Sequence, residues 1–181
     1  MNIENIRESV TNCTKCELCK TRTNAVPGKG NPKARIIFIG EAPGRTEDMK
    51  GEPFVGSAGK KLSDALEKNG ITRDSIYITN VVKCRPPNNR VPTESERESC
   101  RQYLESEIDI IKPEIICVLG NTASNSVLGQ GEITKHRGKI IEKDGKKFFL
   151  TFHPAAIIYN QELAATFESD IATLAKLVNH G

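Results

Sequence analysis

Three features are missing from the 181-residue sequence: a long apolar run, a strong excess of one charge, and any internal repeat or linker. Because no run of about twenty apolar residues exists, we expect no membrane-spanning helix, and the polar residues 1–10 do not resemble a signal peptide. A net charge of +3 argues against indiscriminate nucleic-acid binding but allows a local basic face. We therefore expect a cytosolic protein with a single domain over residues 1–181.

Short apolar runs of strand length are present instead, rich in β-branched and aromatic residues. They cover residues 35–39, 76–82, 115–119 and 148–152, and helix-like stretches over residues 58–69, 93–111, 122–128 and 162–179 alternate with them. This alternation predicts an α/β protein, a three-layer α/β/α sandwich with a central four-stranded, mainly parallel sheet. The turn Asp144-Gly145 predicts a hairpin that pairs Ile140 and Ile141 antiparallel with the last strand.

Each predicted strand is followed by a polar or glycine-rich motif. Gly40-Glu41-Ala42-Pro43-Gly44 follows the first strand, Asn80 lies at the end of the second, Gly120-Asn121 follows the third, and His153-Pro154 follows the last. Ligands of open α/β sheets bind outside the carboxyl ends of the strands. We therefore expect Glu41, Asn80 and His153 to converge on one pocket.

Six cysteines in a protein of this kind favour a metal or cluster site over a disulfide framework, because cytosolic thiols stay reduced. Cys13 and Cys16 form a Cys-x2-Cys pair, and Cys84 and Cys100 lie far downstream. Four thiolates hold either a tetrahedral zinc ion or a [4Fe-4S] cluster, and the spacing does not decide between them. We interpret Cys117, inside an apolar strand, as a small buried hydrophobe and Cys19 as a bystander.

Together these motifs resemble the family 4 uracil-DNA glycosylases over nearly the whole chain. The resemblance is carried by Cys13-Thr-Lys-Cys16, Gly40-Glu-Ala-Pro-Gly-Arg-Thr-Glu-Asp48, Gly51-Glu-Pro-Phe-Val-Gly56, Tyr77-Ile-Thr-Asn-Val-Val-Lys-Cys-Arg-Pro-Pro87, Arg137-Gly138 and His153-Pro-Ala155. It implies removal of uracil from single- and double-stranded DNA in base excision repair. It also implies a [4Fe-4S] cluster, rather than zinc, held by Cys13, Cys16, Cys84 and Cys100.

The resemblance assigns catalytic roles to Glu41 and His153. Cleavage of the glycosidic bond builds positive charge on the sugar and negative charge on the departing base. Glu41 would orient the attacking water and stabilise the sugar cation. His153 would donate a hydrogen bond to uracil O2, for which it need not be cationic.

Recognition of uracil requires a flipped nucleotide, a stacking surface and a polar group facing the base edge. Phe54 would stack on the base, and Asn80 would donate to O4 and accept from N3–H. Gly40 and Ala42 would let main-chain amides approach the base closely. Better-known uracil glycosylases carry a water-activating aspartate where Ala42 stands and a tyrosine that excludes thymine where Gly44 stands. Because both are absent here, we expect Glu47 to exclude the thymine methyl group.

Contacts to DNA are expected from basic residues near these motifs and from the turn after His153. The candidates are Lys83, Arg85 and Arg137 for phosphates, together with Arg90 and Lys135, and Ala155 and Ala156 for the gap left by the flipped base. Residues 86–92 contain no histidine, so we expect no covalent adduct, and no lysine stands out as a nucleophile. The product should be an abasic site in an uncut strand.

Two other functions are compatible with the same residues. A non-catalytic iron-sulfur module that binds DNA would keep the cysteines and Phe54 but gives Glu41 no purpose. A nucleotide-processing hydrolase would use zinc at the cysteines. We expect a monomer, and a replication clamp is a candidate partner.

Overall fold

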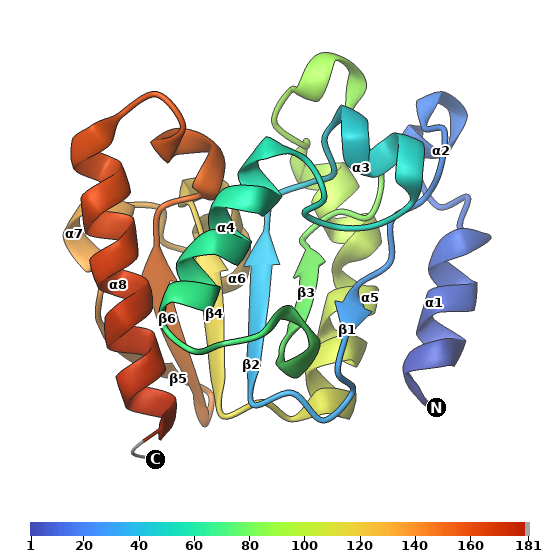
Figure 1. The fold of residues 1–181 in the computed structure, drawn as a ribbon. Coiled ribbons are helices and arrows are strands. Elements are labelled where there is room, and N and C mark those ends of the chain that lie inside the picture. The colour runs from blue at the N-terminus through green and yellow to red at the C-terminus, as the bar shows by residue number, and fades with distance from the viewer. Residues whose placement is uncertain (180–181) are drawn as a thin grey trace.

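The computed structural model describes residues 1–179, so residues 180 and 181 of the expected domain lie outside the described part. Its centre is a sheet with the strand order β1-β3-β2-β4-β6-β5 (Figure 1). The strands are β1 (Lys29–Gly30), β2 (Ile36–Gly40), β3 (Tyr77–Asn80), β4 (Ile115–Leu119), β5 (Ile140–Lys143) and β6 (Lys146–Thr151). The four predicted strands form its parallel centre.

The sheet has six strands within residues 1–179, which corrects the expected four. The additional strands lie at the two edges and run antiparallel to their neighbours. The Asp144-Gly145 turn anticipated β5, and both of its residues have positive φ, as a tight hairpin turn requires. Strand β1 was not predicted, because two exposed residues carry no alternation of apolar and polar side chains.

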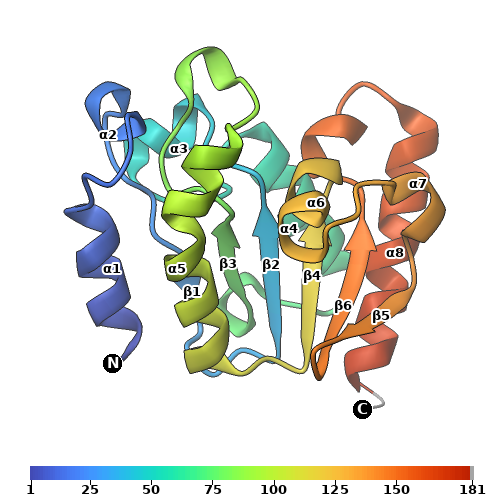
Figure 2. The same ribbon diagram turned by 180° about the vertical axis from the view of Figure 1, so that it is seen from behind.

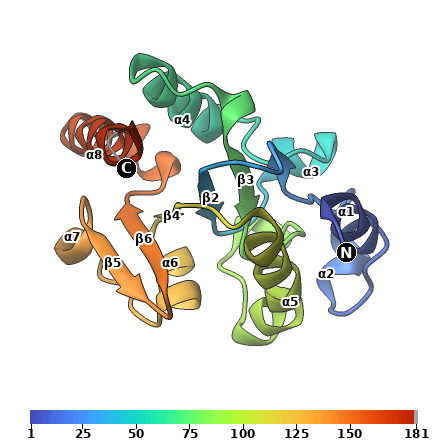
Figure 3. The ribbon, with the colours of Figure 1, turned by 90° about the horizontal axis from the view of Figure 1, so that it is seen from below.

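Helices cover both faces of the sheet (Figures 1, 2 and 3). On one face lie α4 (Ser57–Lys68) and α8 (Gln161–Asn179), and on the other lie α5 (Glu94–Ile111) and α6 (Asn121–Leu128). The remaining helices within residues 1–179 are α1 (Ile3–Thr11), α2 (Leu18–Thr21), α3 (Arg45–Lys50), α7 (Ile133–His136), η1 (Arg73–Ser75), η2 (Pro87–Asn89) and η3 (Pro154–Ile157). The predicted three-layer sandwich is confirmed.

The strands bury both of their faces, since successive side chains of a strand point in opposite directions. In β2, Ile37 and Ile39 join the apolar cluster that includes α1 and α5, whereas Ile36 and Phe38 join the cluster that includes α4 and α8. Cys117 in β4 is fully buried in the second cluster, which confirms its interpretation as a small hydrophobe. The two apolar clusters hold the strands in place from both faces of the sheet. The loops that follow the carboxyl ends of the strands therefore begin at fixed positions.

Candidate active site at the carboxyl ends of the strands

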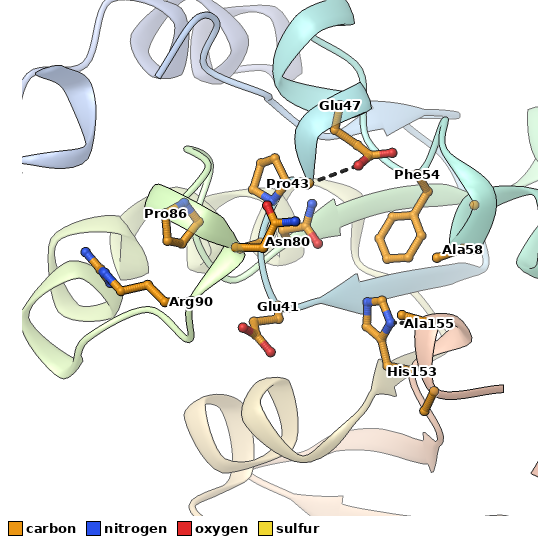
Figure 4. A pocket seen from close by; sticks show the side chains of 15 residues that line it. Glu41, Pro43, Glu47, Phe54, Ala58, Asn80, Pro86, Arg90, His153 and Ala155 are labelled. Atoms are coloured by element: carbon orange, nitrogen blue, oxygen red, sulfur yellow. Dashed lines mark hydrogen bonds between the residues drawn. The ribbon is translucent and has the colours of Figure 1, made fainter. Parts of the chain in front are cut away.

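A cavity of about 410 Å³ opens where β2, β3 and β6 end (Figure 4). Its lining comes from four separate segments of the chain, namely residues 41–47, residues 54–59, Asn80 with residues 86–90, and residues 153–156. Glu41, Asn80 and His153 all belong to this lining, so their predicted convergence is confirmed. The lining also contains Pro86 and Asn89, which the sequence analysis did not place there.

Asn80 lines the cavity and carries a buried polar atom without a partner. The residue is 2% exposed, and its Oδ1 has no hydrogen-bond partner within the described residues 1–179. Gly40 lies beside it in the neighbouring strand, where an added Cβ would stand 2.6 Å from Asn80 Oδ1 and 2.5 Å from Phe54 Cζ. Any larger residue at position 40 would therefore displace both side chains. A buried oxygen without a partner costs free energy unless a ligand satisfies it.

Phe54 forms one apolar wall of the cavity. Its side chain is 6% exposed and packs on the core beneath, and its ring centroid lies 5.7 Å from that of His153 at an angle of 31°. Its backbone has a φ of +52°, which is uncommon for a residue with a large side chain. The wall thus depends on a loop conformation that the surrounding residues must hold.

His153 presents a neutral ring with a defined tautomer. The Ala155 backbone N–H donates to His153 Nδ1 over 3.0 Å, so in the neutral ring the proton resides on Nε2. Burial lowers the pKa of His153 to about 4, and Glu47 opposes this only partly. At neutral pH the residue therefore offers an uncharged N–H donor to a ligand in the cavity.

Glu41 places a carboxylate on another side of the same cavity. Burial raises the pKa of this half-buried side chain, while the Thr122 hydroxyl and the charge of Arg97 act in the opposite direction. A carboxylate removed from water interacts more strongly with a nearby positive charge than an exposed one does. Glu41 is thus suited to stabilise a cation or to accept a proton from water.

Glu47 ties two loops together. Its Oε1 accepts from the Gly44 N–H over 3.0 Å, and its Oε2 accepts from the N–H groups of Val55 (3.0 Å) and Gly56 (2.7 Å). The first bond caps the N–H of Gly44, the N-cap residue of α3, and is the half of a capping box that a glycine N-cap allows. This bracing role was missed, although a glutamate three positions after the helix N-cap is a signal for it. The role of Glu47 against thymine stays a prediction.

Lys83 is buried, contrary to its expected role as a phosphate contact. Its side chain is 1% exposed, and its Nζ donates to Thr79 Oγ1 (2.6 Å), the Asn80 carbonyl (2.6 Å) and Glu107 Oε1 (2.5 Å). An ammonium group enclosed in this way is not available to a DNA phosphate. The predicted phosphate contact of Lys83 is therefore wrong, and the residue instead forms a buried ion pair beneath Asn80.

The other predicted DNA contacts differ in their exposure to solvent and in the hydrogen bonds they already make. Arg85 is half-buried, and its Nε donates to the exposed Asn89. Arg137 holds the buried Asp170 through two hydrogen bonds of 2.9 and 2.7 Å, and its side chain is 33% exposed. Ala155 and Ala156 are exposed in η3 at the cavity rim.

Five cysteines line a second, small cavity between the N-terminal segment and α5. They are Cys13, Cys16, Cys19, Cys84 and Cys100. Arg22 Nη1 lies 3.1 Å from Cys84 Sγ, and the Lys83 N–H lies 3.4 Å from Cys100 Sγ. Burial raises the pKa of Cys100 to about 11, with Lys83 opposing. Among residues 1–179, no three Cys, His, Asp or Glu side chains are arranged to hold a single metal ion.

Four of these cysteines are the predicted set, and Cys19 joins them although the sequence analysis set it aside. Sulfur ligands close to a cationic guanidinium and to a backbone N–H are suited to bind as thiolates. The donor set therefore suits a metal centre held by thiolates. Separately, no helix within residues 1–179 is long and apolar enough to cross a membrane.

The sequence is similar to known proteins over most of its length. The family model for the uracil DNA glycosylase superfamily matches residues 27–177. The type-4 uracil-DNA glycosylase of Archaeoglobus fulgidus is 45% identical over 97% of this chain and 93% of its own length. That of Sulfurisphaera tokodaii is 48% identical over 97% and 84%, and that of Thermotoga maritima is 47% identical over 88% and 84%.

Proposed function

Because the chain belongs to the uracil DNA glycosylase superfamily, we propose that it hydrolyses the N-glycosidic bond of uracil in DNA and leaves an abasic site. The type-4 relatives support this reaction. The observation that carries the proposal is the buried, unpartnered Oδ1 of Asn80, a residue that lines the cavity. Uracil offers the N3–H donor that this oxygen lacks, whereas cytosine N3 is an acceptor and would leave both atoms unpaired.

Base selection follows from the same geometry. The flipped uracil would lie against Phe54, with its N3 and O4 edge facing the Asn80 amide. Sites built on such hydrogen bonds reject an analogue that lacks them by roughly 10⁴ to 10⁵. Glu47, which lines the cavity near Gly44, would stand on the side of the thymine methyl group.

The chemical step would use Glu41 and His153. As the N1–C1′ bond breaks, its electron pair moves to the uracil ring, and His153 Nε2–H donates to O2, where negative charge accumulates. Glu41 would stabilise the positive sugar, orient a water molecule towards C1′ and receive a proton from it. No covalent bond to the protein is needed. The departing uracil anion would take a proton from solvent and Glu41 would return its proton to solvent, so the products are uracil and an abasic site in an intact strand.

The cysteine cavity would hold a [4Fe-4S] cluster through Cys13, Cys16, Cys84 and Cys100, as the type-4 relatives lead us to expect. The cluster would link the N-terminal segment to α5 and to the loop after β3, and it supplies no step of the hydrolysis. This fits the donor set around the cavity. Iron and acid-labile sulfide in the purified protein test the assignment, and zinc in place of iron would contradict it.

DNA would approach the rim of the cavity. Ala155 and Ala156 are placed to enter the gap that the flipped base leaves, and Arg85 and Arg137 are candidates for phosphate contacts. We include both single- and double-stranded DNA as substrates. In a duplex the uracil must first be flipped out of its pair, whereas in a single strand no base pair has to be broken. The monomeric state and the replication-clamp contact stay predictions.

A base-release assay tests the function. End-labelled oligonucleotides with one uracil, single-stranded or opposite guanine or adenine, are incubated with the protein and then treated with alkali. The proposal predicts strand breaks only after alkali and only at uracil. Intact DNA from a folded, iron-containing preparation would favour a DNA-binding module, and breaks before alkali would contradict the proposed mechanism.

A further inference from the structure

Arg73 contacts the loop that carries Phe54 without lining the cavity itself. Its Nη1 donates to the Phe54 carbonyl over 2.6 Å, and its Nη2 donates to the Pro53 carbonyl over 2.5 Å. Nη1 also lies 3.2 Å from Ser63 Oγ in α4. The planar guanidinium thus donates to two successive carbonyls from two fixed N–H groups. A lysine ammonium group has no such rigid fork of donors.

The loop needs such support because its backbone is strained. Phe54 has a φ of +52°, a left-handed conformation that disfavours a bulky side chain. Its carbonyl also lies so close to Gly59 that an added Cβ there would collide with it. Without contacts that select this conformation, the loop would relax and the Phe54 ring would leave its position in the cavity wall.

Two oppositely charged side chains hold the loop between them. Arg73 binds the carbonyls of Pro53 and Phe54, and Glu47 binds the N–H groups of Val55 and Gly56. Burial lowers the pKa of Arg73, and Glu52 and Glu47 oppose this. The two glutamates thus favour the charged form of Arg73, which makes the two carbonyl contacts.

We propose that Arg73 is a positioning residue for uracil recognition. By binding the loop backbone, Arg73 holds the ring of Phe54 in the position where it stacks on the flipped base. The inference rests on the proposed function and adds a residue to it. Arg73 acts through Phe54, so its contribution to catalysis disappears when the ring of Phe54 is absent. A phosphate contact or general support of the fold would not depend on that ring.

The test is a double-mutant cycle of Arg73→Met and Phe54→Ala in the iron-loaded full chain. Stacking of a base on an aromatic ring is worth about 5- to 150-fold in binding. We expect Arg73→Met to lower kcat/KM for uracil removal about tenfold, and never by more than Phe54→Ala does. In the Phe54→Ala background, Arg73→Met should have no further effect. Equal losses in both backgrounds would overturn the proposal.

Binding to abasic DNA gives a second measurement that a structural role would move. This DNA has no base to stack, so Arg73→Met should bind it with an unchanged Kd, whereas a lost phosphate contact or a distorted fold would weaken binding. Arg35→Met is the matched control, since Arg35 donates to the Val178 carbonyl and pairs with Glu114 away from the cavity. The control should keep the wild-type kcat/KM, and a tenfold loss there would contradict a specific role for Arg73.

Arg73→Lys covers the case in which Arg73→Met does not fold. Lysine keeps the positive charge but lacks the two fixed N–H groups of the guanidinium. We therefore expect an intermediate loss in kcat/KM, again only when Phe54 is present. Failure of the proposed function looks different from failure of this inference. If the wild-type protein releases no uracil, both fall together. If the wild-type protein is active and the Arg73 variants lose activity regardless of Phe54, only the positioning role falls.

Discussion

Replacing Lys83 by methionine should destabilise the protein strongly, because it leaves Glu107 charged and buried without its partner. The two side chains are 1% and 0% exposed, and Glu107 otherwise accepts only from Tyr77 (2.6 Å) and Thr79 (3.0 Å) among residues 1–179. Breaking a buried pair in this way costs about 3–5 kcal/mol. At about 2–4 °C per kcal/mol for a domain of this size, Tm should fall by about 6–20 °C.

Thermal unfolding followed by circular dichroism, on preparations with equal iron content, measures this change. The double variant with Lys83→Met and Glu107→Gln should be more stable than Lys83→Met alone, because the amide is neutral and still accepts from Tyr77. Lys60→Met is the control, since the Lys60–Asp64 pair is exposed and should contribute little. An unchanged Tm for Lys83→Met, with weaker and less salt-dependent DNA binding, would refute this reasoning and restore Lys83 as a phosphate contact.

Three further predictions concern the cavity. The rate of uracil release should rise with pH through the raised pKa of Glu41, and this acid limb should be absent from Glu41→Gln; an unshifted limb would exclude Glu41 as its source. Because burial favours the neutral carboxyl, Glu41→Gln should raise the free energy of unfolding at pH 7, and this gain should vanish as the pH falls below the Glu41 pKa; chemical denaturation at both pH values measures it. Glu47→Ala should lower kcat/KM by about tenfold or more even for uracil, since three backbone N–H groups lose their acceptor, whereas a pure barrier to thymine would leave the uracil rate unchanged and admit thymine.

The sheet and the place of the cavity could be predicted because they follow from local patterns. Buried parallel strands appear as apolar runs, and the carboxyl ends of such strands meet at one edge. That is sufficient to bring Glu41, Asn80 and His153 together. The predicted helix over residues 93–111 is likewise present as α5, and a capping box of Thr93 and Glu96 stands at its start.

The contacts that hold the cavity in shape could not be predicted, because their partners are distant in sequence. Lys83 lies in a basic, polar motif, and nothing local indicates that Glu107, 24 positions later in α5, encloses it. Arg73 reaches back 19 positions to the Phe54 carbonyl, and backbone carbonyls leave no signature in a sequence. Polar residues that bind DNA and polar residues that brace a loop are of the same types, so only the three-dimensional contacts separate them.

The most direct test of the account is the base preference of wild-type and Asn80→Ala proteins on oligonucleotides that carry uracil or cytosine at one position. We expect the wild-type protein to form abasic sites at uracil and not at cytosine. Loss of two hydrogen bonds to the base should lower kcat/KM of Asn80→Ala on uracil by roughly 10² or more. Full uracil release by Asn80→Ala, with cytosine still rejected, would contradict the claim that this buried amide recognises the base.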